Sequence, residues 1–233
     1  SRIKRIMLAL TLSRASKVIA VSQAVAMSAK APRGLKSQVV PNGVVAPPEL
    51  QRNSPNGTFT IGAIGRLSPE KGFDILIAAM SQLPGHLLKI AGDGPERKAL
   101  EDQAIQTGVQ NQIEFLGRVE NTNGFYESID CLVVPSRSEG QGIVALEAMA
   151  HSVPVVASNV GGLPEVVIEG ATGLTVTAED TAEMAEAIKQ LTGDEDLRQR
   201  LGEAGRKCVL EQFSVASMIS GTVQVYHDLL SGK

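Results

Sequence analysis

The stretch CLVVPSRSEGQGIVALEAMA, residues 131–150, decides the fold. It opens with four apolar residues, which suit a buried strand. A loop with glycines at 140 and 142 follows, and the run Ile143–Ala150 then has the composition of a buried helix. A fully apolar strand that leads directly into a helix is typical of a parallel sheet covered by helices. Because ligands in such sheets bind at the carboxyl ends of the strands, this loop is a candidate binding site.

The same alternation of strand and helix patterns continues on both sides of this stretch. Short β-branched runs predict strands at Val18–Val21, Gln38–Val40, Phe59–Gly65, Leu87–Ala91, Ile113–Leu116, Cys131–Val134, Val153–Ala157 and Gly173–Val176. Amphipathic runs predict helices at Phe73–Leu83, Glu96–Gln106, Ile143–Ala150, Thr181–Leu191 and Leu197–Glu211. The sequence therefore predicts an α/β fold with a doubly wound parallel sheet.

The order of these elements predicts four parts. Residues 58–212 hold a full set of strands for one open sheet. Prolines and polar residues concentrate between 41 and 57, so residues 46–57 are interpreted as a linker. Residues 1–45 are too few for an independent domain and are interpreted as the tail of a preceding one. Residues 213–233 are patterned as a final helix that needs a partner surface.

Composition excludes several functional classes. The 233-residue chain has a net charge of −3 and no block of Lys and Arg, so no nucleic-acid partner is expected. Its two cysteines, Cys131 and Cys208, lie far apart, as in proteins of a reducing compartment, and a cytoplasmic location is predicted. The basic residues before the apolar run Ile6–Leu12 resemble a signal peptide, but the run is too short, and the start of a helix is the preferred interpretation. No run reaches the ~18 apolar residues of a membrane span.

Glu147 is unusual because its helix is otherwise apolar on every side. A buried carboxylate is costly unless it is paired, so a functional role is favoured over a solvated position. A carboxylate accepts hydrogen bonds from two neighbouring hydroxyls, such as those of a ribose. Glu139, eight residues earlier in the loop, is expected to face a neighbouring part of the same ligand.

A second candidate site follows the strand at 59–65. The segment GAIGRLSPEKG, residues 62–72, carries two cations in one loop. Arg66 offers a fork of donors and Lys71 a mobile point charge, which together suit a diphosphate. Taken alone, this segment also fits an ordinary solvated loop.

Several motifs together resemble the carboxyl-terminal domain of family 4 glycosyltransferases. They are Gly-Arg-Leu-x-x-x-Lys-Gly at 65–72, Ala-Gly-Asp-Gly-Pro-Glu at 91–96, Phe-Leu-Gly-Arg-Val at 115–119, Pro-Ser-x-x-Glu-Gly-x-Gly-x-x-x-Leu-Glu-Ala-Met-Ala at 135–150, Pro-Val-Val-Ala at 154–157 and Gly-Gly-Leu-Pro-Glu at 161–165. They occur in the family's order and cover roughly residues 16–230. The resemblance implies the GT-B architecture, in which two Rossmann-like domains face each other across a cleft and the carboxyl-terminal one holds a nucleotide-sugar.

The resemblance also implies roles for individual residues. Glu139 and Glu147 would be the acids of a Glu-x7-Glu motif that contact the donor sugar and the ribose, while Arg66 and Lys71 would neutralise the diphosphate. We count Glu139, Arg66 and Lys71 as catalytic. The expected donor-binding residues are Glu147, Gly65, Gly117, Arg118, Val119, Gly140, Gln141, Gly142, Ile143 and Val144. No metal site and no cofactor are expected, and the substrate would be a UDP- or GDP-sugar.

Three positions depart from the family pattern. Gln141 stands where the family usually has an aromatic or large apolar residue, His151-Ser152 replace a small residue and glycine, and Val215 replaces the usual Trp near the final helix. The first departure bears on the shape of the sugar pocket and the last on how the final helix docks.

Weaker signals allow two interpretations each. Asp194-x-Asp196 matches the metal motif of the other main glycosyltransferase fold, but its position at a helix start favours capping. The histidines His86, His151 and His227 lack ligand spacing. Glu165 is assigned equally to ligand contact and to a helix start.

The sequence thus predicts the donor-binding part of a retaining glycosyltransferase of the hexosyltransferase type. Its acceptor would be an unknown sugar, lipid or small molecule in polysaccharide or glycolipid biosynthesis. The amino-terminal domain, in cis or as a partner chain, would complete the cleft, so the chain alone is expected to bind its donor, not to transfer sugar, and to self-associate. A peripheral membrane association of the full enzyme stays open. The alternatives are a nucleotide-sugar-binding subunit and a GT-B epimerase.

Overall fold

The computed structural model describes residues 7, 11, 15–28, 37–48 and 57–231. Most of the apolar run Ile6–Leu12 and most of the predicted linker lie outside the described residues. Within the described part of the chain, no helix combines the length and the apolar character needed to cross a membrane.

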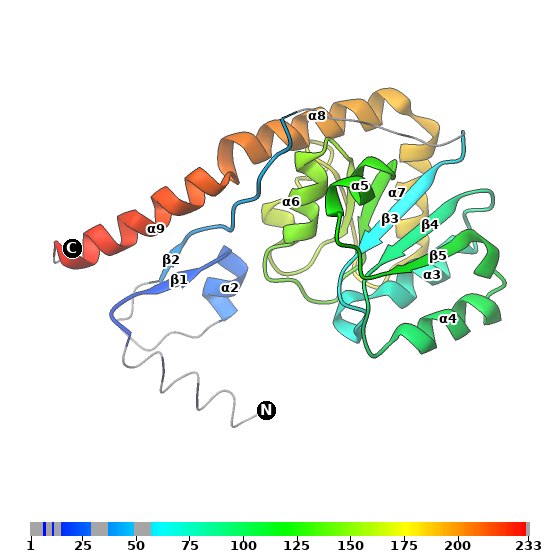
Figure 1. Ribbon diagram of the computed structural model, residues 1–233, viewed down its shortest axis with the longest axis horizontal. Helices are drawn as coiled ribbons and strands as arrows, with labels where there is room; N and C mark the ends of the chain where they lie inside the picture. The colour runs from blue at the N-terminus through cyan, green and yellow to red at the C-terminus, as the bar shows by residue number, and fades with distance from the viewer. Residues whose placement is uncertain (1–6, 8–10, 12–14, 29–36, 49–56, 232–233) are drawn as a thin grey trace.

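A parallel sheet of six strands forms the centre of the molecule (Figure 1). The strands are β3 (Thr60–Ile64), β4 (Leu87–Ala91), β5 (Ile113–Gly117), β6 (Cys131–Val134), β7 (Val155–Ser158) and β8 (Leu174–Val176). Their order is β5-β4-β3-β6-β7-β8, and every neighbouring pair is parallel. Strands β3, β4 and β5 therefore follow one another toward one edge of the sheet, and β6, β7 and β8 follow one another toward the other edge. The predicted doubly wound α/β fold is confirmed, and its switch point lies between β3 and β6.

Helices cover both faces of the sheet and define two apolar clusters. Helices α3 (Phe73–Met80), α4 (Arg97–Gln106) and α7 (Thr181–Gly193) pack against one face. Helices α5 (Thr122–Glu127) and α6 (Ile143–Ala150) pack against the other. The long helix α8 (Glu195–Gln212) contributes Leu201 to the first cluster and Val209 to the second. Three short 3-10 helices, η1 (Pro69–Lys71), η2 (Gln110–Gln112) and η3 (Leu163–Glu165), lie in the connections.

Capping side chains set the starts of the later helices. Asp180 accepts a hydrogen bond from the Glu183 amide at 2.9 Å at the start of α7. Asp194 accepts one from the Leu197 amide at 2.8 Å at the start of α8. The capping interpretation of Asp194-x-Asp196 is confirmed, because this carboxylate satisfies an amide that the helix itself leaves free.

Helix α5 was not expected from the sequence. The run Asn121-Thr122-Asn123-Gly124 is dense in residues typical of turns, which hides a helix start. In the structure Asn121 is the N-cap, and its side chain accepts from the Gly124 amide at 3.1 Å. The helix then buries Phe125 and Tyr126 against the sheet.

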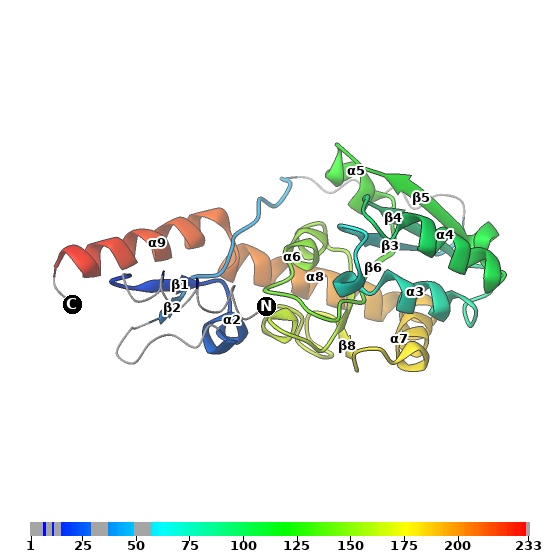
Figure 2. The ribbon, with the colours of Figure 1, turned by 90° about the horizontal axis from the view of Figure 1, so that it is seen from below.

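A smaller unit lies beside the sheet domain. We call residues 15–28 and 37–45 the upstream segment; it holds β1 (Val18–Ala20), α2 (Gln23–Ser28) and β2 (Ser37–Val39), with β1 and β2 parallel. The last helix, α9 (Val215–Leu230), runs along it (Figure 2). Lys17 pairs with Asp228 at 3.4 Å, and Gly221 lies against Val40. The upstream segment therefore covers part of the final helix.

Candidate functional site

The loops after β3, β4 and β5 stack closely at the carboxyl edge of the sheet. The Gly65 amide donates to the Ala91 carbonyl at 3.0 Å, and the Gly92 amide donates to the Gly117 carbonyl at 2.6 Å. A Cβ at Gly92 would lie 1.8 Å from the Gly65 carbonyl oxygen, so only glycine fits there. This packing leaves a cavity of about 680 Å³ lined by Gly65, Arg66, Gly92, Asp93, Gly94, Pro95 and Arg118.

Two cations share this cavity. Arg66 and Arg118 are both exposed and both line it. They reach it from the ends of β3 and β5, two strands separated by β4. Guanidinium groups on one cavity favour an anionic ligand such as a phosphate. The structure therefore brings Arg66 together with Arg118, and Lys71 is not part of this cavity's lining.

Lys71 is instead paired with Glu139. Its Nζ lies 2.6 Å from Glu139 Oε2, and the two side chains are 27% and 15% exposed. The other oxygen of Glu139 accepts from the Gly140 amide at 3.2 Å. The pair joins the β3–α3 loop to the β6–α6 loop at the switch point. Two residues predicted to act on neighbouring parts of one ligand are thus in contact.

The start of α6 offers backbone amides to the same region. Gly142, in the left-handed conformation with φ of 91°, is the N-cap, and no side chain caps the helix there. The first amides of a helix carry partial positive charge and bind anions. Val144, in the first turn, lines a recess together with Lys71 and Glu139. These amides therefore lie beside the ion pair.

Glu147 is held by a buried tyrosine. The Tyr126 hydroxyl donates to Glu147 Oε2 at 2.7 Å, and the tyrosine is 1% exposed. Burial, reinforced by the neighbouring Glu147 carboxylate, raises the pKa of Tyr126 far above its usual range. The phenol therefore stays a neutral donor at physiological pH. Glu147 therefore has the partner expected for a carboxylate in an apolar helix, and its Oε2 is bonded to the Tyr126 hydroxyl.

Glu147 also lines a second cavity, of about 340 Å³. Its other lining residues are Gly43, Val44, Val45, Thr122, Asn123, Tyr126, Ile143, His151 and Val215. This cavity lies between the upstream segment, α5, α6 and the start of α9. It is distinct from the arginine-lined cavity, so Glu147, predicted to contact the ribose, and Arg66, predicted to contact the diphosphate, line separate hollows.

Gln141 and Glu165 make contacts that the sequence did not indicate. The Gln141 side chain is 3% exposed and bonds to Asn42 of the upstream segment. Both oxygens of Glu165 accept backbone amides of α2, from Gln23 at 2.8 Å and Ala24 at 2.9 Å. Glu165 thus caps a helix start, although it is that of a distant helix. Both side chains tie the upstream segment to loops at the carboxyl edge.

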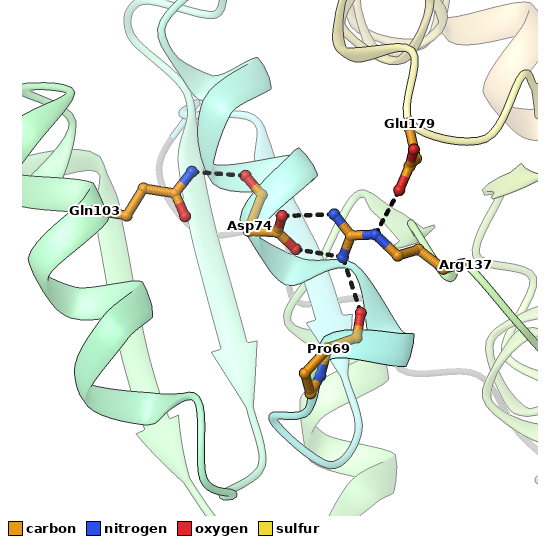
Figure 3. Close-up of polar contacts among 5 residues, drawn as sticks. All are labelled: Pro69, Asp74, Gln103, Arg137 and Glu179. Carbon is orange, nitrogen blue, oxygen red and sulfur yellow. Dashed lines mark hydrogen bonds and ion pairs between the residues drawn. The ribbon is translucent and has the colours of Figure 1, made fainter. Parts of the chain in front are cut away.

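Arg137 connects three loops around the ion pair (Figure 3). It binds both oxygens of Asp74, at 2.8 and 2.7 Å, and Glu179 Oε1 at 2.6 Å. It also donates to the Pro69 carbonyl at 2.8 Å. The guanidinium holds the pKa of Asp74 below its usual range. Arg137 belongs to the β6–α6 loop, which carries Glu139, and donates to Pro69 of η1, which carries Lys71. It therefore holds these two loops in place relative to each other.

Sequence reasoning missed Arg137 and Tyr126 for different reasons. Arg137 occupies a variable position within the motif that identified the loop, and an arginine in a loop is commonly solvated. Tyr126 is one of two tyrosines in the chain, and it lies in the helix α5 that the turn-forming residues concealed. The one available signal was Glu147 itself, because a carboxylate in an apolar helix requires a partner.

The histidines have structural partners or lie apart from the site. His151 contacts the Glu147 carbonyl at 2.7 Å through Nδ1 and Asn123 at 3.2 Å through Nε2. Over residues 15–28, 37–48 and 57–231, no three His, Cys, Asp or Glu side chains are grouped so that they could hold a metal ion.

Comparison with known proteins identifies relatives of the sheet domain. The profile of the family described as glycosyl transferases group 1 matches residues 49–208. Over 196 residues, 81% of the chain, the sequence is 36% identical to the glycogen synthase of Mycobacterium tuberculosis and covers 47% of it. The chain spans about half the length of the curated relatives it matches.

Two solved structures share the fold over nearly the whole chain. The sucrose-phosphate synthase of Thermosynechococcus elongatus superimposes with a TM-score of 0.89 at 27% identity, over 100% of this chain and 63% of that one. The HepE protein of Anabaena in complex with UDP-glucose superimposes with a TM-score of 0.88 at 28% identity, over 99% of this chain and 68% of that one.

Proposed function

Because this chain belongs to the group 1 glycosyl transferases, with the fold of the carboxyl-terminal GT-B domain, we propose that it binds the nucleoside-diphosphate-sugar donor of a retaining hexosyltransferase. One observation carries the proposal. Loops at the carboxyl ends of the strands carry the two arginines of one cavity, after β3 and β5, and, between β3 and β6, the Lys71–Glu139 pair beside the start of α6, which no side chain caps. An edge with that charge and those free amides suits a diphosphate attached to a sugar.

The donor is proposed to lie along the carboxyl edge of the sheet. The base would meet the backbone around Gly117–Val119, and the ribose would meet Glu147. Arg66 and Lys71 would neutralise the diphosphate. Glu139 and the amides of residues 142–144 would contact the sugar. The Lys71–Glu139 pair supports this order, because the side chains proposed for the phosphate and for the sugar lie 2.6 Å apart.

A UDP-sugar is the proposed donor. The HepE structure holds UDP-glucose and shares 28% of its residues with this chain. GDP-sugars remain the second class to test, because no side chain of the described site distinguishes uracil from guanine. The acceptor is proposed to be a sugar, lipid or small molecule held by a domain opposite this one. In that arrangement the chain alone binds the donor without transferring its sugar, since an acceptor must be oriented before it can attack.

Catalysis would rest on stabilising the leaving group. As the glycosidic bond breaks, negative charge develops on the diphosphate, and Arg66, Lys71 and the first amides of α6 are placed to stabilise it. No metal ion is assigned to this step. The acceptor is proposed to attack the face from which the diphosphate departs, so the anomeric configuration is retained. No protein nucleophile is assigned.

Thermal unfolding against a ligand panel tests donor binding. UDP, GDP and their hexose derivatives would each be added to the purified chain. A ligand that binds only the folded state at 100 times its Kd adds about 2.7 kcal/mol of stability. For a domain of this size that shift corresponds to roughly 5–10 °C in Tm. A panel in which no nucleoside diphosphate or its sugar raises the Tm would refute the proposal.

Glu147→Ala tests the ribose contact. The variant should weaken binding of the nucleotide by roughly 1.5–3 kcal/mol, the value of hydrogen bonds to a charged group. Titration calorimetry with UDP measures the loss. Glu203→Ala is the matched control, because Glu203 is exposed on α8 away from both cavities. If a folded Glu147→Ala variant binds UDP as the control does, Glu147 does not hold the ribose.

A further inference from the structure

Gln141 is a buried glutamine whose amide is paired with one neighbour. Its Oε1 accepts from the backbone amide of Asn42 and from Asn42 Nδ2, both at 2.8 Å. Its Nε2 donates to the Asn42 carbonyl at 3.3 Å. Only 3% of Gln141 is exposed. A buried amide is tolerated only when it is paired, so Asn42 and Gln141 depend on each other.

Asn42 itself is fixed by the junction of α8 and α9. A Cβ on the next residue, Gly43, would lie 2.3 Å from the Ser214 carbonyl oxygen, so the backbones touch there. The Val44 amide donates to the Phe213 carbonyl at 2.9 Å. Asn42 therefore presents its three hydrogen-bonding groups from an anchored backbone. Gln141, the other partner, lies in the loop between β6 and α6.

The same loop is held at its neighbouring residue as well. The Ser22 hydroxyl, 1% exposed, donates to the Gly140 carbonyl at 2.6 Å. The Gly162 amide donates to the Glu139 carbonyl at 3.1 Å. The loop that precedes α6 is thus attached to the upstream segment through two consecutive residues, Gly140 and Gln141. The loop is also attached to the sheet domain, through the Glu139 carbonyl, the Lys71–Glu139 pair and the Arg137 side chain.

We propose that Gln141 is a positioning residue that couples the sugar end of the donor site to the upstream segment. Through Asn42, it sets where the backbone of the neighbouring Glu139 lies, and with it the Glu139 carboxylate. Binding of the sugar then depends on the placement of the upstream segment, whereas binding of the nucleotide does not. The inference rests on the proposed function, since it assigns Glu139 to the donor sugar.

The test compares affinities for a nucleotide and its sugar. Titration calorimetry on the full chain would give the Kd of UDP and of UDP-glucose, UDP-galactose and UDP-N-acetylglucosamine. The UDP-sugar whose Kd differs most from that of UDP is then used to compare the variants. The variants are Gln141→Met, which keeps the length of the side chain without its amide, Asn42→Ala and the double variant. Asn42 is only partly buried, so Asn42→Ala supplies a folded variant if Gln141→Met is unstable. Gln199→Met, on exposed α8, is the matched control.

We expect the Kd of the UDP-sugar to rise by about 5- to 10-fold relative to the Kd of UDP in each single variant, as for one lost hydrogen-bonded contact. The Kd of UDP alone should stay within about twofold, and the double variant should lose no more than the single ones, since the partners act as a unit. A purely structural role would lower the Tm and leave the ratio of the two Kd values unchanged, and that result overturns the inference while sparing the proposed function. A wild-type chain that binds none of these ligands overturns both.

Discussion

Tyr126 and Glu147 form a buried hydrogen bond in the candidate site. The phenol is buried, its pKa is raised by that burial and by the carboxylate, and its hydrogen bond to Glu147 is 2.7 Å long. The buried phenol orients the Glu147 side chain by donating to Oε2. Glu147 also lines the second cavity, where a carboxylate can accept hydrogen bonds from a diol.

Tyr126→Phe tests this arrangement. The substitution keeps the buried ring and removes only the donor, so the fold should persist. We expect the affinity for UDP to fall by roughly 1 kcal/mol, because Glu147 loses the bond that orients it. Calorimetry with uridine and UDP should show the same loss for both, since the effect acts on the ribose. A loss seen with UDP and absent with uridine would place Glu147 at the phosphates instead.

The sequence indicated that Glu147 is unusual, whereas it did not indicate which residue is its partner, and the difference has a physical reason. The cost of burying a charge is local, so the isolation of Glu147 in α6 could be recognised from eight neighbouring residues. Its partner, 21 residues away, depends on how α5 packs against α6, which no local pattern encodes. Gln141 was predicted to bind the donor, and the sequence did not indicate the bonds that its side chain makes to Asn42, because they depend on how the upstream segment packs.

At the scale of elements, the loops at the switch point are joined by ionic contacts in addition to packing. Arg137 extends from the β6–α6 loop and reaches Asp74 at the start of α3, Pro69 in η1 and Glu179 before α7 (Figure 3). Glu179 has a φ of 67°, a conformation that non-glycine residues adopt at a cost. Its side chain accepts a hydrogen bond from the same Arg137 guanidinium that binds Asp74, which helps to hold this conformation.

Arg137→Met should loosen this junction. We expect a loss of about 1 kcal/mol in the free energy of unfolding at pH 7, because the pair is a bidentate but partly exposed ion pair. Since the guanidinium lowers the pKa of Asp74 in the folded state, this stability is present above the ordinary pKa of an aspartate and is lost as the pH falls through the lower folded pKa. Urea unfolding at pH 7 and pH 3 should therefore show a gap to wild type that narrows in acid.

The control for this prediction is Lys98→Met. Lys98 pairs with Asp102 at 2.6 Å on the surface of α4, where the lysine side chain is 80% exposed. That substitution should change stability less than Arg137→Met does. If the two variants are equally stable at pH 7, Arg137 does not hold the loops together.

The sequence predicted which helices and strands exist better than it predicted the residues at which they begin and end. Fully apolar runs at β6 and the periodicity of α7 and α8 survive in the structure because burial and local pattern agree there. The predicted helix Phe73–Leu83 ends at Met80, since the turn before Pro84 closes it early. The predicted strand Val153–Ala157 begins two residues later, at Val155. Ends of elements depend on competing hydrogen bonds, which a periodic pattern does not report.

At the scale of the whole molecule, α9 is covered on one side only by the part of the chain that the structure describes. Val225 is 2% exposed against the upstream segment, whereas Val223, Tyr226 and Leu230 are 59%, 62% and 90% exposed. Apolar side chains gathered on one helix face favour association. The chain is therefore expected to self-associate through α9, separately from donor binding at the opposite end of the fold.

Sedimentation at rising protein concentration checks this expectation. The double variant Val223→Lys, Tyr226→Lys should reduce self-association and leave the affinity for UDP unchanged, because the substitutions add charge to the exposed face alone. Ile105→Lys, on α4, is the matched control, since Ile105 is 61% exposed outside this face. Equal association of both variants would show that α9 is not the contact surface.

The central claim is that the cations at the carboxyl edge bind a diphosphate, and one titration tests it most directly. Calorimetry in EDTA would compare uridine with UDP for the wild-type chain and for Arg66→Ala, Lys71→Ala. Lys189→Ala, Lys207→Ala removes the same charge from exposed positions on α7 and α8 as the control. The account predicts that wild type and control bind UDP roughly 10- to 100-fold more tightly than uridine, as charge-assisted hydrogen bonds imply, and that the site variant loses most of this preference. A site variant that keeps the full preference for UDP, or a wild-type chain that shows none, would contradict it.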